Sequence, residues 1–183
     1  MSLHTSDLVL VPGQQLPPLE TISGFQVRPG FFRFFGATVI PGGVNFTIQS
    51  HGATSCELLL FHKGEEEPFA VLPFPEHYKI GFVYSMIVFG FDIEEYEYAY
   101  RLDGPYQPEK GLIYDKTKYI LDPYAKAVTG QSEWGIHLPC TQNCQYKSRV
   151  VRNNFDWGNC KQPLIPIKDN IIYELHVRGF TKD

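Results

Sequence analysis

Three tyrosines stand at alternate positions in the segment YEYAYR, and this spacing can place aromatic rings side by side. Tyr96, Tyr98 and Tyr100, the tyrosine stripe, share one face of a predicted strand, because successive side chains of a strand point to opposite sides. Such rings can stack on the C–H face of a pyranose, and each phenol oxygen can hydrogen-bond a sugar hydroxyl. The alternative is structural, since any strand with one buried face alternates in this way. The pattern favours the buried face, and a sugar platform is the functional alternative.

The two tryptophans of the chain, Trp134 and Trp157, lie in a polar stretch rich in asparagine and glutamine. An exposed indole in a loop can stack on a glucan, so Trp134 joins the tyrosine stripe as a candidate carbohydrate-binding residue. The alternative, which the position of both residues favours, is that the indoles pack against a neighbouring domain.

Four cysteines raise the question of a metal site or a disulfide. His137, Cys140, Cys144 and Cys160 have spacings loosely compatible with a Cys3His zinc site, and Cys56 stands apart from them. Nothing else nearby supports zinc. Reduced thiols are favoured over both zinc and a disulfide, as is usual for a protein of a reducing compartment. We therefore expect no metal.

The acidic residues do not predict an acid–base pair. Asp92, Glu94, Glu95 and Glu97 are close in sequence, but strand alternation and exposure provide no difference in environment that would separate two pKa values. The chain also lacks a nucleophile-elbow motif, a phosphate-binding loop and an HExxH motif.

Short strands are the elements that must position these residues. Residues 37–49 predict a hairpin, because Val44, Phe46 and Ile48 alternate with polar residues after a Pro-Gly-Gly turn. Residues 24–128 contain no amphipathic period of useful length with a helix cap. Further strands are predicted over 55–63, 69–74, 81–90 and 94–104. Six or seven short strands predict an all-β fold, an immunoglobulin-like antiparallel β-sandwich.

Residue composition and hydrophobic periodicity divide the chain into four parts. The predicted parts are an extended arm (1–23), the sandwich (24–128), an irregular connector (129–170) and a final strand (171–183). Residues 171–177 carry bulky side chains on both faces, which is typical of a strand covered on both sides within a larger sheet. Without such cover, we expect this segment either to fray or to pair with another edge.

Charge and hydropathy exclude several classes of partner. The net charge of −4 and the pI near 5.9 argue against nucleic-acid binding. No segment approaches the roughly 20 apolar residues that span a bilayer, and the apolar stretch 8–12 follows an acid rather than basic residues. We expect a soluble cytoplasmic protein without membrane contact.

Five segments, in order, resemble one family. They are FGATVIPGGVNFTIQSHGA (35–53), YEYAYRLDGPYQPEKG (96–111), LDPYAKAVTG (121–130), FDWG (155–158) and IIYELHVRGFT (171–181). These segments are similar to the N-terminal sandwich of isoamylase-type glycogen debranching enzymes of the α-amylase family, to the approach to their (β/α)8 catalytic barrel and to its first strand.

The resemblance implies an enzyme that hydrolyses α-1,6 branch linkages in glycogen or limit dextrin with two carboxylates. In the family these acids follow later barrel strands, so this chain is expected to contain no catalytic residue and to need no cofactor. The expected partners are the downstream barrel and α-glucan. Because tight glucan binders of this class use paired tryptophans, which are absent before residue 134, the favoured role is to support the barrel and extend its glucan site. The alternatives are a free-standing glycogen- or starch-binding module and a sandwich that contacts only proteins.

Overall fold

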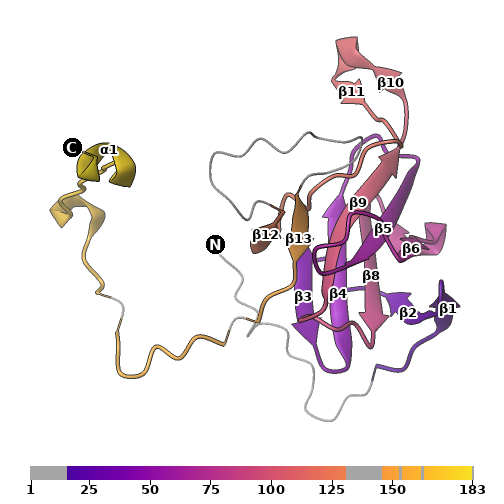
Figure 1. Ribbon diagram of the computed structural model, residues 1–183, viewed down its shortest axis with the longest axis horizontal. Helices are drawn as coiled ribbons and strands as arrows, with labels where there is room; N and C mark the ends of the chain where they lie inside the picture. The colour runs from indigo at the N-terminus through magenta and orange to yellow at the C-terminus, as the bar shows by residue number, and fades with distance from the viewer. Residues whose placement is uncertain (1–15, 131–145, 153, 162, 183) are drawn as a thin grey trace. The chain divides into compact units, whose positions relative to one another are not determined.

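The computed structural model describes residues 16–130, 146–152, 154–161 and 163–182 (Figure 1). They fall into two compact units, the first ending at Arg152 and the second formed by residues 153–183. The first unit contains two antiparallel sheets and a short projecting hairpin. Within the described residues, no helix is both long and apolar enough to cross a membrane.

The first sheet has the strand order β1-β2-β8-β4-β3, with β7 added to β8. Its strands are β1 (Glu20–Ile22), β2 (Phe25–Pro29), β3 (Gly36–Ile40), β4 (Gly43–Gln49), β7 (Lys79–Ile80) and β8 (Val83–Phe89). The predicted hairpin over 37–49 is confirmed as β3 and β4. Gly42 makes its turn at φ +83°, a backbone conformation that glycine adopts without a steric penalty.

The second sheet has the order β12-β13-β9-β5-β6. Its strands are β5 (Ser55–His62), β6 (Ala70–Pro73), β9 (Tyr96–Asp103), β12 (Ala127–Thr129) and β13 (Lys147–Arg149). A separate pair, β10 (Tyr106–Gln107) and β11 (Leu112–Ile113), forms the projecting hairpin. The helical turns are η2 (Glu76–Tyr78), η3 (Pro108–Lys110), η4 (Ile167–Asp169) and α1 (Val177–Thr181).

The core lies between the two sheets because each strand turns an apolar face inward. Val44, Phe46 and Ile48 of β4 are buried and pair in register with β8. Phe46 meets Tyr98 of the opposite sheet with ring centroids 5.1 Å apart. Removal of these apolar faces from water is the main stabilising contribution, about 25 cal/mol per Å². The predicted antiparallel β-sandwich is therefore confirmed.

Two boundaries differ from the sequence prediction. Residues 20–22 of the predicted arm form β1 and pair with β2. Residues 147–149 of the predicted connector form β13, which pairs with β9 and with β12. The sandwich thus extends to Val150, which is buried. A three-residue strand has too few residues for a visible period, and the open backbone groups of β9 determine where it pairs.

The predicted strand at 171–177 is not formed among the described residues. Ile171 is 99% exposed and Tyr173 is 77% exposed, and the chain turns into α1 at Val177. A strand satisfies its backbone donors and acceptors only through a neighbouring strand. Residues 163–182 have no such neighbour in this structure, so the segment forms no strand and stays unpaired.

Candidate functional site

The tyrosine stripe faces the core over most of its length. Tyr98 and Tyr100 are fully buried, whereas Tyr96 is half-buried at the rim of the sandwich. The ring of Tyr98 packs against Phe46, and that of Tyr100 packs against Phe74. Tyr98 and Tyr100 therefore present no face to an external sugar. In these two residues the alternation reflects the buried face of a strand. Trp134, the other candidate, lies outside the described residues.

A buried polar network holds Tyr98 in place. Its hydroxyl donates a hydrogen bond of 2.7 Å to Oδ2 of Asp122, and the backbone N–H of Tyr124 donates to Oδ1 of the same carboxylate at 2.8 Å. The Asp122 N–H donates to Oγ of Ser148 on β13. Burial raises the pKa of Asp122, and the two hydrogen bonds to the carboxylate oppose that shift. The network fastens the LDPYAKA segment to the core.

The cysteines do not form a metal site within the described residues. Cys56 is a free, buried thiol. Burial raises the pKa of this thiol, so it stays protonated and unreactive at neutral pH. Cys160 is a free, exposed thiol. The remaining members of the zinc alternative, His137, Cys140 and Cys144, lie outside the described residues.

Tyr96 joins three other aromatic residues in what we term the rim cluster: Phe25, His62, Phe69 and Tyr96. The His62 and Phe69 rings are stacked, with centroids 4.2 Å apart and an interplanar angle of 22°. Tyr96 lies 4.9 Å from Phe69, and Phe25 lies 6.2 Å from Phe69. Phe69 is 40% exposed and His62 is exposed. The cluster thus offers aromatic surface to the solvent.

The rim cluster is backed by the core. Tyr96 contacts Phe91 at 5.4 Å, and Phe91 contacts Phe46 at 5.3 Å. Four segments bring the cluster together, because His62 ends β5, Phe69 precedes β6, and Phe25 and Tyr96 begin β2 and β9. Of the four residues in the rim cluster, only Tyr96 was a candidate on the basis of the sequence. The others were missed because His62 and Phe69 meet only through the β5–β6 pairing, and Phe25 reaches them from the other sheet.

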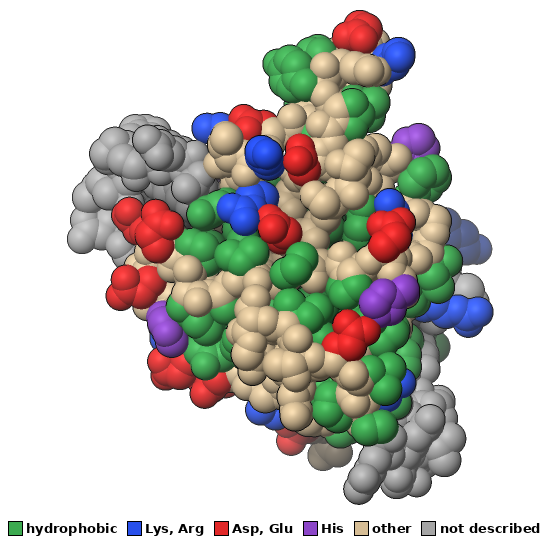
Figure 2. Space-filling model, turned by 90° about the vertical axis from the view of Figure 1, so that its right-hand side faces the viewer, with side chains coloured by type: hydrophobic (Ala, Val, Ile, Leu, Met, Phe, Trp, Pro, Cys, Tyr) green, Lys and Arg blue, Asp and Glu red, His purple; other side chains and the backbone are tan. Residues whose placement is uncertain are grey.

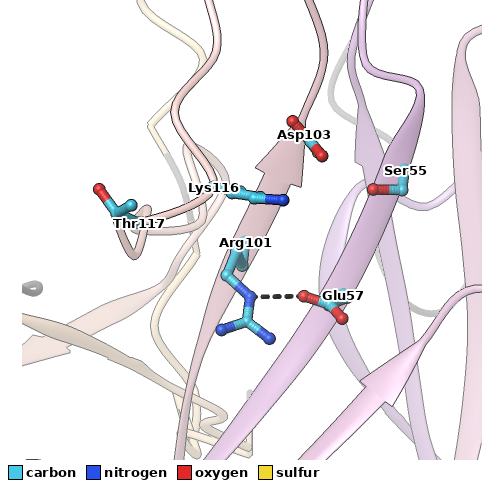
Figure 3. A pocket seen from close by; sticks show the side chains of 6 residues that line it. All are labelled: Ser55, Glu57, Arg101, Asp103, Lys116 and Thr117. Atoms are coloured by element: carbon cyan, nitrogen blue, oxygen red, sulfur yellow. Dashed lines mark hydrogen bonds and ion pairs between the residues drawn. The ribbon is translucent and has the colours of Figure 1, made fainter.

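The outer face of the second sheet carries a polar hollow of about 460 Å³. It is lined by Ser55, Glu57, Arg101, Asp103, Lys116 and Thr117, whose side chains are drawn in Figure 3. Arg101 Nε donates a hydrogen bond to Glu57 Oε2, and this bond raises the pKa of Arg101. Oδ1 of Asp103 accepts from the Gly104 N–H. These groups can hydrogen-bond a polar ligand, but the hollow has no aromatic lining residue for stacking.

Figure 2 shows one face of the molecule on which hydrophobic side chains are interspersed with acidic, basic and histidine side chains. A sugar combines apolar C–H faces with hydroxyl groups, and a mixed surface of this kind can contact both. In the second unit, Trp157 is 70% exposed and meets Phe155 edge to face at 4.9 Å. Exposed aromatic surface is therefore present in both units.

Comparison with known proteins places this sandwich in a family. Residues 34–125 match carbohydrate-binding module 48, the isoamylase N-terminal domain. The chain is 37% identical over 158 residues to the chloroplastic isoamylase SU1 of Zea mays, covering 80% of this chain and 20% of that protein. It is 31% identical over 149 residues to the glycogen debranching enzyme of Yersinia enterocolitica, covering 76% of this chain and 22% of that protein.

The fold is also found in a solved structure. Apo pullulanase from Paenibacillus barengoltzii superposes with a TM-score of 0.54 at 23% identity, over 79% of this chain and 19% of that one. This likeness concerns the fold alone. The chain spans about a fifth of the length of the curated relatives described above. The family match covers half of the chain and most of both sheets. The chain therefore belongs to the carbohydrate-binding module 48 family, the N-terminal domain of isoamylases.

Proposed function

We propose that this chain is the N-terminal accessory module of a glycogen debranching enzyme that hydrolyses α-1,6 branch linkages in glycogen or limit dextrin. The observation that carries the proposal is the match of residues 34–125 to the isoamylase N-terminal domain. The relatives named isoamylase and glycogen debranching enzyme, of which the chain spans about a fifth, support it. The enzyme would act in the cytoplasm and require no cofactor.

In this proposal, the catalytic residues lie in a following (β/α)8 barrel and not in the sandwich. Residues 171–177, unpaired in this structure, would become its first strand, and the segment from β13 to residue 170 would lead to it. Glycoside hydrolysis of this kind needs two carboxylates a few ångströms apart, one as acid and base and one as nucleophile. The carboxylates of the polar hollow do not suit this role, because Glu57 is paired with Arg101 and Asp103 with a backbone N–H.

Tyr96 is proposed to contact α-glucan as part of the rim cluster. The exposed parts of Phe69 and His62 supply flat apolar surface, and the Tyr96 hydroxyl supplies a hydrogen-bonding group. One or two such contacts correspond to weak binding, with a Kd of about 1 mM or a standard binding free energy of about −4 kcal/mol. A weak site suits an accessory module that holds a long polymer beside a catalytic domain.

The test is calorimetry of the chain with maltoheptaose. Phe69→Ala and Tyr96→Ala should each abolish measurable heat, whereas Tyr106→Ala, which removes a 71% exposed ring on the projecting hairpin, should not. An equal loss of binding heat in the Tyr106→Ala variant would contradict a glucan contact at the rim cluster. Absence of binding by the unmodified chain would leave the supporting role alone.

The alternative function is a free-standing glucan-binding module without a catalytic partner. The same exposed aromatic surface favours this alternative. It differs from the debranching-enzyme proposal in the expected size of the protein that the cell makes. An immunoblot of source cells distinguishes the two. A band several times larger than 20.9 kDa supports the debranching enzyme, and a band near 20.9 kDa supports the free-standing module.

A further inference from the structure

A second pair of stacked aromatic rings lies outside the core, away from the rim cluster in sequence. Phe35 and Tyr124 have ring centroids 4.9 Å apart and an interplanar angle of 27°. Phe35 is 37% exposed and Tyr124 is 42% exposed. Ile120 and Val128, on either side of Tyr124 in sequence, are 38% and 53% exposed. We call Phe35, Ile120, Tyr124 and Val128 the exit-side patch.

The aromatic pair is held rigidly by backbone features. Gly36 has φ +82°, and a Cβ at this position would lie 2.9 Å from the Tyr124 carbonyl oxygen, so only glycine permits the close approach of the two segments. On the other side, the Asp122 carboxylate accepts the Tyr124 N–H, and the Ala125 N–H donates to the Asp122 carbonyl. Because both backbones are constrained, the exposed rings are preorganised.

The exit-side patch lies where both sheets end. Phe35 precedes β3, the edge strand of the first sheet, and Tyr124 precedes β12, the edge strand of the second. β3, β12 and β13 lie on the same side of the sandwich in Figure 1. Ile120 bridges to Tyr100 on the edge of β9 that β13 also uses. β13 is the last strand of the sandwich, so the chain leaves this unit beside the patch.

We infer that the exit-side patch is the surface on which the following catalytic domain docks; this inference rests on the proposed function. The relatives continue far beyond the matched region, and a domain joined through β13 is tethered beside the patch at high local concentration. An inter-domain interface buries roughly 600–1,500 Å² and needs apolar anchors, which preorganised aromatic rings provide at low entropic cost. Docking would also cover the open edges of β3 and β12.

Hydroxyl-radical footprinting of the full-length gene product tests the inference directly, because it reports the solvent exposure of individual side chains. The reference is the 183-residue chain, in which Phe35 and Tyr124 are exposed. We expect both side chains to be oxidised several-fold more slowly in the full-length protein. Equal oxidation rates in the two proteins would overturn the inference.

Thermal unfolding of full-length variants supplies an independent readout. Phe35→Ala combined with Tyr124→Ala should separate the unfolding of the sandwich from that of the catalytic domain, which the unmodified protein should show as one coupled transition. Phe82→Ala is the matched control, because Phe82 is 47% exposed and its ring also lies against a neighbouring ring, that of His51, with centroids 4.2 Å apart. The control should leave the coupled transition unchanged, and a double variant that behaves like the control would contradict docking.

The outcomes distinguish this inference from the proposed function. Debranching activity with unprotected Phe35 and Tyr124 would overturn only the docking surface. A gene product without a following domain would remove the docking surface and the debranching assignment together. Protection of both rings in a protein that does not cleave α-1,6 linkages would retain the docking surface and overturn the proposed reaction.

Discussion

Replacing Asp122 by alanine tests whether the DPY segment is held by the buried carboxylate. Asp122 is 4% exposed, and its two oxygens accept one hydrogen bond each, from the Tyr98 hydroxyl and the Tyr124 N–H. The substitution removes both acceptors. It leaves the Tyr98 hydroxyl inside a fully buried environment without its acceptor.

The expected loss of stability follows from these contacts. Loss of the carboxylate acceptor of a buried hydroxyl costs about 1–3 kcal/mol, here toward the lower end because Ser148 also hydrogen-bonds the Tyr98 hydroxyl, and the lost bond from the Tyr124 N–H adds about 1 kcal/mol. Relief of the desolvation that raises the Asp122 pKa offsets part of this loss. We therefore expect Asp122→Ala to lower the free energy of unfolding by about 2 kcal/mol, a fall in Tm of roughly 4–8 °C.

Urea unfolding of the 183-residue chain, followed by circular dichroism, measures this loss. Tyr98→Phe removes the hydroxyl and should cost about 1–2 kcal/mol, while the double variant should cost clearly less than the sum of the single variants, because the two residues share one bond. Asp122→Asn keeps a side-chain oxygen for the Tyr124 N–H and is the matched control, expected to lose about half as much. A loss within 0.5 kcal/mol of zero for Asp122→Ala, on the order of an ordinary surface substitution, would refute the reasoning, as would additive single variants.

Three further predictions concern pH, the close approach at Gly36 and a second buried network. Burial raises the pKa of Asp122 in the folded state above its ordinary value of 3.8. The stability of the unmodified chain relative to Asp122→Asn should therefore be greatest below pH 3.8 and should fall as the pH rises through the folded-state pKa. Urea titrations across the acidic range measure this dependence. Gly36→Ala should cost about 2 kcal/mol or more, because it adds a Cβ at φ +82° and 2.9 Å from the Tyr124 carbonyl oxygen. Gly64→Ala is its control, with φ +83° and nothing within 4 Å, and equal losses in thermal unfolding would show that the close approach is unimportant. Asn45→Ala should cost about 2–3 kcal/mol, since fully buried Asn45 accepts the Phe31 N–H at 2.7 Å; a change under about 0.5 kcal/mol in urea unfolding would contradict this account.

The sequence was sufficient for elements whose signal is local. Alternation in GVNFTIQ and the preceding Pro-Gly-Gly turn predicted the β3–β4 hairpin, since both strands and their turn lie within 14 residues. The same alternation placed the tyrosine stripe on one face of β9. It did not decide whether that face met a core or a sugar, because alternation specifies which side chains share a face and not what covers it.

The exposed aromatic sites were beyond local reasoning because their members meet only through the sheets. Phe69 and His62 stack across a hairpin, and Tyr96 joins them from β9. Only the rim residue of the predicted stripe, Tyr96, is open to the solvent, because the opposite sheet covers Tyr98.

The sequence by itself determined the fold class and, through five ordered segments, the family. Tertiary structure alone decided which residues reach the surface together. Phe35 and Tyr124 stack although they are far apart in the chain, and β13 joins the sandwich from within the predicted connector. The physical reason is that strand-forming propensity and alternation are properties of neighbouring residues, whereas burial and exposure depend on which distant strands pair and which sheet faces pack.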